Sequence, residues 1–505
     1  MSLLGLDIGT SGCKAVVFSY EGVLLAQEHR EYDLIRPRPG WAEFNSKEVW
    51  KKVKNVIRIV ASKTTNDPIT TMSISSCGEA MTPVSKDRKI LDNAILGFDE
   101  RGSEYIPQFI DNIGEKETYY INGNKPSAFF SAPKLIWYKK NKPKIYDEAE
   151  YFLNWHDLVF FLLGCEPVTD FSLANRTLLF DLENEKWSEQ LINAIGISIK
   201  KLPRPLPSGT NIGTVSNKMA DELGLKHNVY CVTGGHDQCC NALGAGVISS
   251  GQAAYGIGTF ICITPTFDKK PDMEIFYKYN LNIEHHVVSG HYVSFIYNMT
   301  GGSLLKWFRD EFSLLEKKIA QQNGTDVYDD LIRQIPDSPT DLFVLPYFAP
   351  TGSPWFDAKT PGNILGLRLE TSRWQLLKAL MEGVTYYIAE GMEIIYQTGI
   401  KINEYRPTGG GAKSNKWIQM KADIMGKPFT RPKILEASSL GAAMLAGAAT
   451  GVYDSLKQAV ENLVKVDKVF QPDKKNNEIY MKNLEKYKKM RIAIEDLFKK
   501  SFESN

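Results

Sequence analysis

The sequence lacks the features that mark secreted, membrane-spanning and nucleic-acid-binding proteins. Its 505 residues include only seven cysteines, which are scattered without the spacing of a disulfide framework or a zinc site. Apolar runs stay far below the ~20 residues that cross a bilayer, and no charged and apolar leader precedes the first predicted strand. Lys and Arg number 60 against 59 Asp and Glu, a net charge of +1 that gives no reason to expect nucleic acid or a membrane as partner. We therefore expect a soluble, cytoplasmic protein that binds small molecules.

The chain is too long for one hydrophobic core, so we expect two domains, 1–247 and 248–505. Apolar runs separated by glycine-containing turns over 4–27 predict a three-stranded antiparallel meander. A 3.6-residue period then predicts a helix over 46–62, and a strand follows at 69–75. Residues 252–266 repeat the glycine-turn hairpin half a chain later, which indicates a duplicated α/β domain. The Lys- and Glu-rich stretch 473–500 predicts a solvated surface helix.

Three glycine-rich turns have the composition of phosphate-binding loops. In the first, Asp7 ends a predicted strand and is followed by a turn with Thr10, Ser11 and Lys14. Glycines let the backbone approach an anion, hydroxyls and amides donate to phosphate oxygens, and a carboxylate can hold magnesium through water. A hairpin that needs glycine only for its backbone geometry is the alternative. Similar turns around 256–259 and 409–412 favour a nucleotide site.

Two longer motifs carry a resemblance to a known family. Residues 129–141 read FFSAPKLIWYKKN, and residues 362–382 read GNILGLRLETSRWQLLKALME. With the three turns, they make the sequence over 4–453 resemble the FGGY family of carbohydrate kinases. The resemblance implies an α/β, two-domain fold of the actin, Hsp70 and hexokinase type (ribonuclease H-like) with an interdomain cleft. It also implies ATP and Mg2+ as cofactors and a homodimer as one expected state.

The resemblance assigns roles to residues of both domains. Asp7 and Asp237 resemble the carboxylates that organise magnesium, and Asp237 in the segment GGHDQ resembles the catalytic base. The ATP-binding residues that it implies are Thr10, Ser11, Lys14, Gly258, Thr259, Gly302, Gly410, Gly411, Ala412 and Asn415.

Asp237 also has a physical case of its own. A sugar hydroxyl is a poor nucleophile at neutral pH, and a carboxylate within hydrogen-bond reach can accept its proton, which contributes roughly 10²–10⁴-fold. The alternative is an Asp that caps the helix predicted to begin at Gln238. Its neighbour His236 is a second-rank candidate for contact with the substrate.

The acceptor is expected near the segment after the strand at 69–75. Glycerol kinases carry an Arg-Glu pair there, whereas this chain has Gly78 and Glu79, and Phe129 stands where they have a tyrosine. The chain thus lacks both the arginine and the tyrosine that bind hydroxyls in glycerol kinases, which argues against glycerol as the acceptor. The substrate-binding residues that we expect are Cys77, Gly78, Glu79, Asp99, Arg101, His236, Asp237 and Gln238. For Asp99 and Arg101, a surface ion pair is the alternative.

These observations predict a kinase that moves the terminal phosphoryl group of ATP to a hydroxyl of a small sugar, with a ketopentose such as xylulose as the expected acceptor. A kinase for glycerol, another polyol or a sugar acid stays open. A non-catalytic sugar sensor or an actin-like protein is the alternative from another class.

Overall fold

The computed structural model describes residues 1–503, and the side chains of residues 1–500. The chain divides into two compact units. Unit 1 comprises Met1–Ile248, Asn282–Val293 and Glu436–Lys465, and unit 2 comprises Ser249–Leu281, Ser294–Leu435 and Val466–Asn505. We expected one boundary, after residue 247. The structure also places two later segments, Asn282–Val293 and Glu436–Lys465, in unit 1. Over the described residues, no helix has the length and apolar character to span a membrane.

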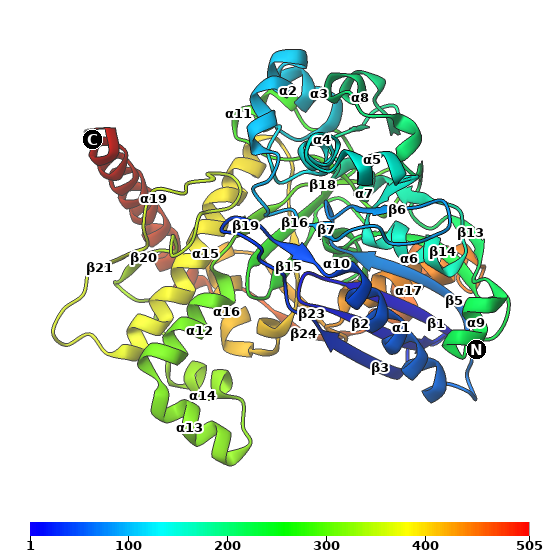
Figure 1. Cartoon of the computed structure of the whole chain (residues 1–505). Helices are drawn as coiled ribbons and strands as arrows, with labels where there is room; N and C mark the ends of the chain where they lie inside the picture. The colour runs from blue at the N-terminus through cyan, green and yellow to red at the C-terminus, as the bar shows by residue number, and fades with distance from the viewer. Residues whose placement is uncertain (504–505) are drawn as a thin grey trace. The chain divides into compact units, whose positions relative to one another are not determined.

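Unit 1 is built on a six-stranded mixed sheet (Figure 1). The predicted meander is confirmed as β1 (Ser2–Ile8), β2 (Gly12–Ser19) and β3 (Leu24–Glu31), which pair in antiparallel fashion. On the other side of β1 lie β5 (Ile69–Ser76) and β14 (Tyr230–His236), both parallel to β1, and then β13 (Asn211–Thr214). The sheet order is therefore β13-β14-β5-β1-β2-β3.

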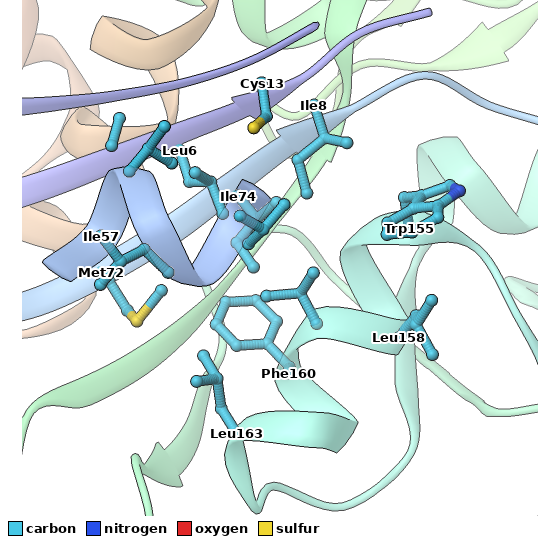
Figure 2. Close-up of a cluster of buried hydrophobic side chains, with 14 of the residues drawn as sticks. Leu6, Ile8, Cys13, Ile57, Met72, Ile74, Trp155, Leu158, Phe160 and Leu163 are labelled. Atoms are coloured by element: carbon cyan, nitrogen blue, oxygen red, sulfur yellow. The ribbon is translucent and has the colours of Figure 1, made fainter. Parts of the chain in front are cut away.

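The two faces of strand β1 bury different neighbours because its side chains alternate. Leu4, Leu6 and Ile8 point into the main core, which α1 (Ser46–Lys63) and α6 (Trp155–Leu163) close from the same side (Figure 2). On the opposite face the backbone of Gly5 lies directly against Ser439 of α17 (Ala437–Ala449), where no Cβ would fit. By the same alternation Asp7 lies on the α17 face of the sheet.

The remaining elements of unit 1 surround this sheet. They are β4 (Glu43–Phe44), β6 (Thr82–Val84), β7 (Ala94–Ile95), η1 (Ser103–Tyr105), α2 (Ile106–Ile113), α3 (Glu115–Asn122), α4 (Ser131–Asn141), α5 (Pro143–Glu148), β8 (Tyr151–Leu153), β9 (Val168–Asp170), α7 (Phe171–Asn175), β10 (Phe180–Asp181), β11 (Lys186–Trp187), α8 (Glu189–Ile195), η2 (Ile199–Lys201), β12 (Arg204–Leu206), α9 (Asn217–Leu223), α10 (Asp237–Gly244), β17 (Glu284–His285), β18 (Tyr292–Val293) and α18 (Leu456–Leu463).

Unit 2 repeats the central pattern of unit 1. The hairpin predicted at 252–266 is confirmed as β15 (Gln252–Ile257) and β16 (Ile261–Phe267), with β19 (Ile296–Asn298) on β16. Strand β22 (Glu404–Thr408) runs parallel to β15, as β5 does to β1, and β23 (Phe429–Pro432) and β24 (Val466–Phe470) extend the sheet. The other elements are α11 (Met273–Lys278), α12 (Gly301–Phe312), α13 (Leu314–Asn323), α14 (Val327–Gln334), β20 (Phe343–Leu345), β21 (Asn363–Leu365), α15 (Arg373–Gln397), η3 (Gly410–Lys413), α16 (Asn415–Met425) and α19 (Lys474–Glu503).

The prediction of a C-terminal helix is right, but its description as a solvated surface helix is wrong for one face. Tyr480 and Tyr487 of α19 are buried, and the Tyr480 hydroxyl donates to the buried carboxylate of Glu382 on α15 at 2.9 Å. Arg491 likewise pairs with Glu390 of α15. The many charges of this stretch hide an amphipathic pattern, because several of its polar side chains find buried partners on α15.

The segment Asn282–Val293 is fastened to the rest of unit 1 by a buried histidine. The Nε2–H of His286 donates to the carbonyl of Val247 at 3.2 Å, and its Nδ1 accepts from the amide of Val287 at 2.9 Å. Burial lowers the pKa of His286 to about 4, with His291 and Glu284 as the titratable groups that act on it. The imidazole is therefore neutral at pH 7, and both of its nitrogens are used.

This histidine should make the fold sensitive to mild acid. An unfolded histidine gains its proton near pH 6.5 and the native one only near pH 4, so the free energy of unfolding should fall as the pH drops between these values. We expect a loss of about 2 kcal/mol from this group between pH 7 and pH 5. His286→Gln should flatten this slope in urea unfolding curves measured from pH 7 to pH 5 beside wild type. An unaltered slope in His286→Gln would contradict the assignment.

Candidate active site

Three neighbouring parallel strands of unit 1 end at the same edge of the sheet. In the register of β1 and β5, Asp7 lies opposite Ser75 and Ile8 opposite Ser76, and in that of β14 and β5, His236 also lies opposite Ser76. Residues that follow the three strands therefore gather at one level. These residues are the turn after Ile8, the segment from Cys77 to Glu79, and Asp237, which begins α10.

Asp7 and Asp237 form a pair of acidic groups at this edge. The Ser75 hydroxyl donates to Asp7 Oδ1 at 2.8 Å. Burial raises the pKa of Asp7 to about 7, and the negative charge of Asp237 adds to this rise, against the hydrogen bond from Ser75 and the charge of Lys14. Two neighbouring carboxyl groups of this kind are a donor set that suits a hard divalent cation. The residues present thus fit the magnesium that the sequence implies.

The first glycine turn joins β1 and β2. The amide of Gly9 donates to the carbonyl of Gly12 at 3.0 Å, and the intervening Thr10 and Ser11 are exposed. The ammonium of Lys14 instead pairs with Glu436, which immediately precedes α17. Lys14 therefore has a carboxylate partner within its own unit.

The implied nucleotide residues of unit 2 gather around the turn after β15. The amides of Gly302 and Ser303 at the start of α12 donate to the carbonyls of Gly258 at 2.9 Å and Thr259 at 3.2 Å. Gly302 has no room for a side chain, because a Cβ there would collide with the carbonyl oxygen of Gly258. The β15 turn and the N-terminus of α12 are thus held in backbone contact.

The third glycine turn lies against the same strand end. A Cβ on Gly409 would lie 2.8 Å from the carbonyl oxygen of Ile257, and Gly411 packs on the Ile257 side chain. Ala412 is buried, whereas Asn415 at the start of α16 is exposed. A Cβ on Gly410 would meet no heavy atom within 4 Å, so this backbone faces open space.

The structure around residues 77–79 changes part of the sequence-based argument about the acceptor. Gly78 does lack a side chain, but the guanidinium of Arg176, the residue that ends α7, pairs with the carboxylate of Glu79. Position 78 carries no cation, but Arg176, 97 positions after Glu79, places one beside the Glu79 carboxylate. Gly78 by itself therefore does not exclude glycerol, because Arg176 brings a guanidinium to Glu79 from another element. The separate argument from Phe129, which lacks the hydroxyl of a tyrosine, is unchanged.

His236 belongs to a buried chain of charged groups. Its Nδ1 lies 2.7 Å from Glu284 Oε1, and its Nε2 lies 3.3 Å from Asp237 Oδ1. Burial alone would lower the pKa of His236, but the charge and hydrogen bond of Glu284 outweigh it and raise the pKa to about 9. The imidazole is therefore cationic at neutral pH and lies beside the candidate base. Gln238 donates its side-chain amide to Asp237 at 3.3 Å.

Asp99 and Arg101 are a buried ion pair, so the alternative of a surface pair is wrong. Arg101 donates to both Asp99 and Glu43, and its guanidinium lies 4.0 Å from the ring centroid of Trp41. The side chain of Asp99 is fully buried and also accepts from the amide of Ala42. These contacts join Arg101 and Asp99 to Glu43 and Ala42, so the pair braces the segment around residue 99.

Several residues of this site were not identified from the sequence. Asp170 caps α7 and accepts from the hydroxyl of Ser172 at 2.6 Å, and that hydroxyl accepts from the amide of His236 at 2.8 Å. Arg176 and Glu284 complete the charged chain, with 3.4 Å between Arg176 NH1 and Glu284 Oε2. Only Asp170 carries a local signal, an Asp placed before a short helix. Arg176 and Glu284 lie in segments whose positions follow from tertiary structure alone.

Three potential metal ligands in this chain are better described as part of the ion-pair network. Atoms of His236, Cys239 and Glu284 lie within 4.8 Å of one another. A protonated imidazole and the guanidinium of Arg176 already neutralise Glu284 and lower its pKa despite its burial. A cation there would repel both groups, so we assign no metal to this cluster.

Both compact units thus carry glycine turns, and unit 1 carries the acidic pair Asp7 and Asp237. A model of the N-terminal domain of the FGGY family of carbohydrate kinases matches residues 2–244, and a model of its C-terminal domain matches residues 277–450. The chain belongs to this family. It is accordingly an ATP-dependent carbohydrate kinase of the actin-like fold, and ATP with Mg2+ is the usual cofactor of such enzymes.

Individual relatives span nearly the whole chain at low identity. The chain is 28% identical to a xylulose kinase of Bacillus subtilis, over 100% of this chain and 99% of the relative, and 27% identical to a gluconokinase of the same organism, over 92% and 90%. A ligand-bound xylulose kinase structure from Lactobacillus acidophilus superimposes with a TM-score of 0.87 at 22% identity, covering 99% of each chain. A glycerol kinase with ADP from Plasmodium falciparum gives 0.85 at 22%, covering 97% and 98%. The solved structures confirm the expected fold class.

The packing around the β15 turn can be tested by two glycine substitutions. Gly302→Ala should reduce the free energy of unfolding by about 1–3 kcal/mol, because its Cβ must displace the backbone of Gly258. Gly410→Ala should leave the unfolding midpoint of the apoprotein unchanged, since its Cβ meets open space. Thermal or urea unfolding of both variants measures this difference. Equal midpoints for Gly302→Ala and wild type would contradict the described contact.

Proposed function

We propose that this kinase phosphorylates a hydroxyl of a neutral ketopentose such as xylulose, in the cytoplasm, with Asp237 as general base. The observation that carries this proposal is the gathering of Asp7, Glu79 and Asp237 at one edge of the sheet in unit 1. The seven cysteines are all free thiols, which is in keeping with a reducing compartment.

Asp237 is suited to accept the proton of the attacking hydroxyl. Its side chain is partly exposed, 26% by area, so a substrate can reach it. The cationic imidazole of His236 lies 3.3 Å from Asp237 Oδ1 and holds this carboxylate in place beside the acceptor segment. The alternative of a helix cap at Asp237 is wrong, because α10 begins at Asp237 itself and the capping position falls on His236.

The donor half of the proposal rests on backbone groups. In unit 1, the amides and hydroxyls of Thr10 and Ser11 are suited to phosphate oxygens. In unit 2, the turn of Gly258 and Thr259 offers donors of the same kind. Magnesium, when bound by Asp7 and Asp237, neutralises charge on the transferred phosphoryl group. The open backbone of Gly410 and the exposed Asn415 are suited to hold the adenosine.

The charge of the acceptor site favours a neutral substrate. We call the side chains of Glu79, Arg176, His236 and Glu284 the acceptor wall. Its two carboxylates are balanced by the guanidinium of Arg176 and the imidazolium of His236, so the acceptor wall carries no net charge. An uncharged sugar meets no unpaired charge there, whereas a sugar acid would bring a carboxylate next to Glu79. The xylulose kinases among the relatives support the same choice.

A kinase for glycerol or a sugar acid is the second candidate. The gluconokinase of Bacillus subtilis is almost as similar as the xylulose kinase, at 27% against 28% identity. Arg176 and Glu79 also recreate the arginine and glutamate pair of glycerol kinases, although Phe129 lacks the hydroxyl of their tyrosine. The choice among acceptors is therefore an experimental one.

Replacing the candidate base should separate catalysis from binding. Asp237→Asn should lower kcat by roughly 10²–10⁴-fold because the amide cannot accept the proton. The dissociation constant of a nucleotide measured without magnesium should stay within about twofold of wild type. Asp221→Asn, at an exposed carboxylate in the same unit, is the matched control and should keep full activity. A kcat near that of wild type in Asp237→Asn would rule out the base assignment.

A panel of acceptors tests the substrate. With ATP and magnesium, a coupled assay of ADP release should give the highest kcat/KM for a ketopentose and values at least tenfold lower for glycerol and gluconate. A preference for gluconate would contradict the argument from the neutral wall. A preference for glycerol would show instead that Phe129 does not exclude it.

A further inference from the structure

We infer that Arg176 is a positioning residue that sets the acceptor specificity of this kinase, and that Gly78 is glycine because the side chain of Arg176 occupies the adjoining space. The inference rests on the proposed function in one respect, namely that Glu79 contacts the acceptor. The recognition group would then be a carboxylate held by an arginine from a different element, suited to a hydroxyl of a neutral polyhydroxy substrate.

The space beside Gly78 is filled by Arg176. A Cβ at position 78 would lie 3.2 Å from Arg176 Cβ, 3.1 Å from its Cγ and 3.5 Å from His236 Cδ2. These distances are tighter than ordinary van der Waals contact for the arginine, so any larger residue at position 78 must move it. A side chain at position 78 and the side chain of Arg176 would therefore compete for the same space. A chain that has Arg176 requires a small residue at position 78.

Arg176 fixes one oxygen of Glu79. Both Nε and NH2 of Arg176 contact Glu79 Oε1. The other oxygen lies toward Gly97, where a Cβ would be 3.2 Å from Oε2 and 3.3 Å from the ring of Phe129. The carboxylate is thus held between a guanidinium on one side and a bare backbone and an aromatic ring on the other.

The backbone of Glu79 is also held in an unusual conformation. Its φ of 64° lies in the left-handed region, which costs a residue with a side chain about 1 kcal/mol or more. Its carbonyl accepts from the hydroxyl of Ser131 at 2.9 Å. A strained residue that is braced in this way keeps a defined side-chain direction, which a recognition group needs.

The far side of Arg176 connects Glu79 with the candidate base. Its NH1 lies 3.4 Å from Glu284 Oε2, Glu284 contacts His236, and His236 contacts Asp237. Every charged group in this buried chain lies next to one of opposite sign, and removing one member leaves its neighbours unpaired away from water. Loss of Arg176 would bring the two carboxylates of Glu79 and Glu284 together without the cation that separates them.

Substitution of Arg176 should change the acceptor parameters and not the nucleotide parameters. With the acceptor that wild type turns over with the highest kcat/KM, Arg176→Gln should raise the KM for the acceptor roughly 10- to 100-fold, which is the range for a lost charge-assisted hydrogen bond. The KM for ATP should stay within about twofold. Arg176→Lys should recover part of the loss, since it keeps the charge but not the planar fork. The ratio of kcat/KM between two acceptors should also shift.

Gly78 provides a coupled test. In wild type, Gly78→Ala should raise the acceptor KM because the methyl group pushes on Arg176. In the Arg176→Ala background the same change should have little further effect, since the space is vacant. The two costs should thus be strongly non-additive. Arg88→Gln is the control and should leave the acceptor KM unchanged. Arg88, in the same unit, donates to the carbonyls of Phe161 and Cys165 and lies over the Phe161 ring, so none of these contacts involves Glu79, Arg176 or His236.

Two results would overturn the inference. One is a fall of kcat/KM in Arg176→Gln and Arg176→Lys by the same factor for every acceptor, with KM values unchanged, which is the behaviour of a merely structural residue. The other is full additivity of the costs at positions 78 and 176. If Arg176→Gln does not fold, as judged by its unfolding midpoint, Arg176→Lys and Gly78→Ala carry the test. A wild type that rejects ketopentoses would defeat the proposed substrate and leave this test intact on its own best acceptor.

Discussion

The parallel register of β1, β5 and β14 is the constraint on which the site depends. It aligns Asp7, Ser75 and His236 at nearly the same level, so that the chain leaves three strands at one edge of the sheet. Each strand end is followed by a different chemical group: the glycine turn after Asp7 that we propose binds phosphate, the proposed acceptor segment with Glu79, and the proposed base Asp237 at the start of α10. A slip of one residue in any of these pairings would turn the functional side chains to the opposite face.

The same edge holds several charges out of water, and their pairing explains the second layer of residues. A buried carboxylate is tolerated only next to a cation or strong donors. Glu79 and Glu284 meet this condition through Arg176 and His236, whereas Asp7 does so less completely, with burial and Asp237 raising its pKa to about 7. The charges of Glu79, Glu284, Arg176 and His236 thus balance one another, and Asp7 and Asp237 are the pair that we propose binds magnesium. This division of charge suits the proposed neutral sugar and the highly charged nucleotide of a kinase.

The sequence predicted the features that are encoded locally. Glycine turns and apolar alternation identified both hairpins, and the helical period placed α1, because these patterns depend on residues close together in the chain. The candidate base and the phosphate turns followed from motifs. Arg176 and Glu284 were not predicted, since they reach the site through tertiary packing from 97 positions after Glu79 and from 48 positions after His236. The charged C-terminal helix was taken as fully solvated because its buried contacts, such as Tyr480 with Glu382, involve polar partners distant in sequence.

The central claim is that a sugar hydroxyl loses its proton to Asp237 while Glu79 holds the same sugar. A crystal structure with xylulose, magnesium and a non-hydrolysable ATP analogue tests it most directly. The account predicts one hydroxyl within about 3.2 Å of an Asp237 carboxylate oxygen and a second hydroxyl at hydrogen-bond distance from Glu79. A sugar bound with no hydroxyl near Asp237, or with Glu79 turned away from it, would contradict the account.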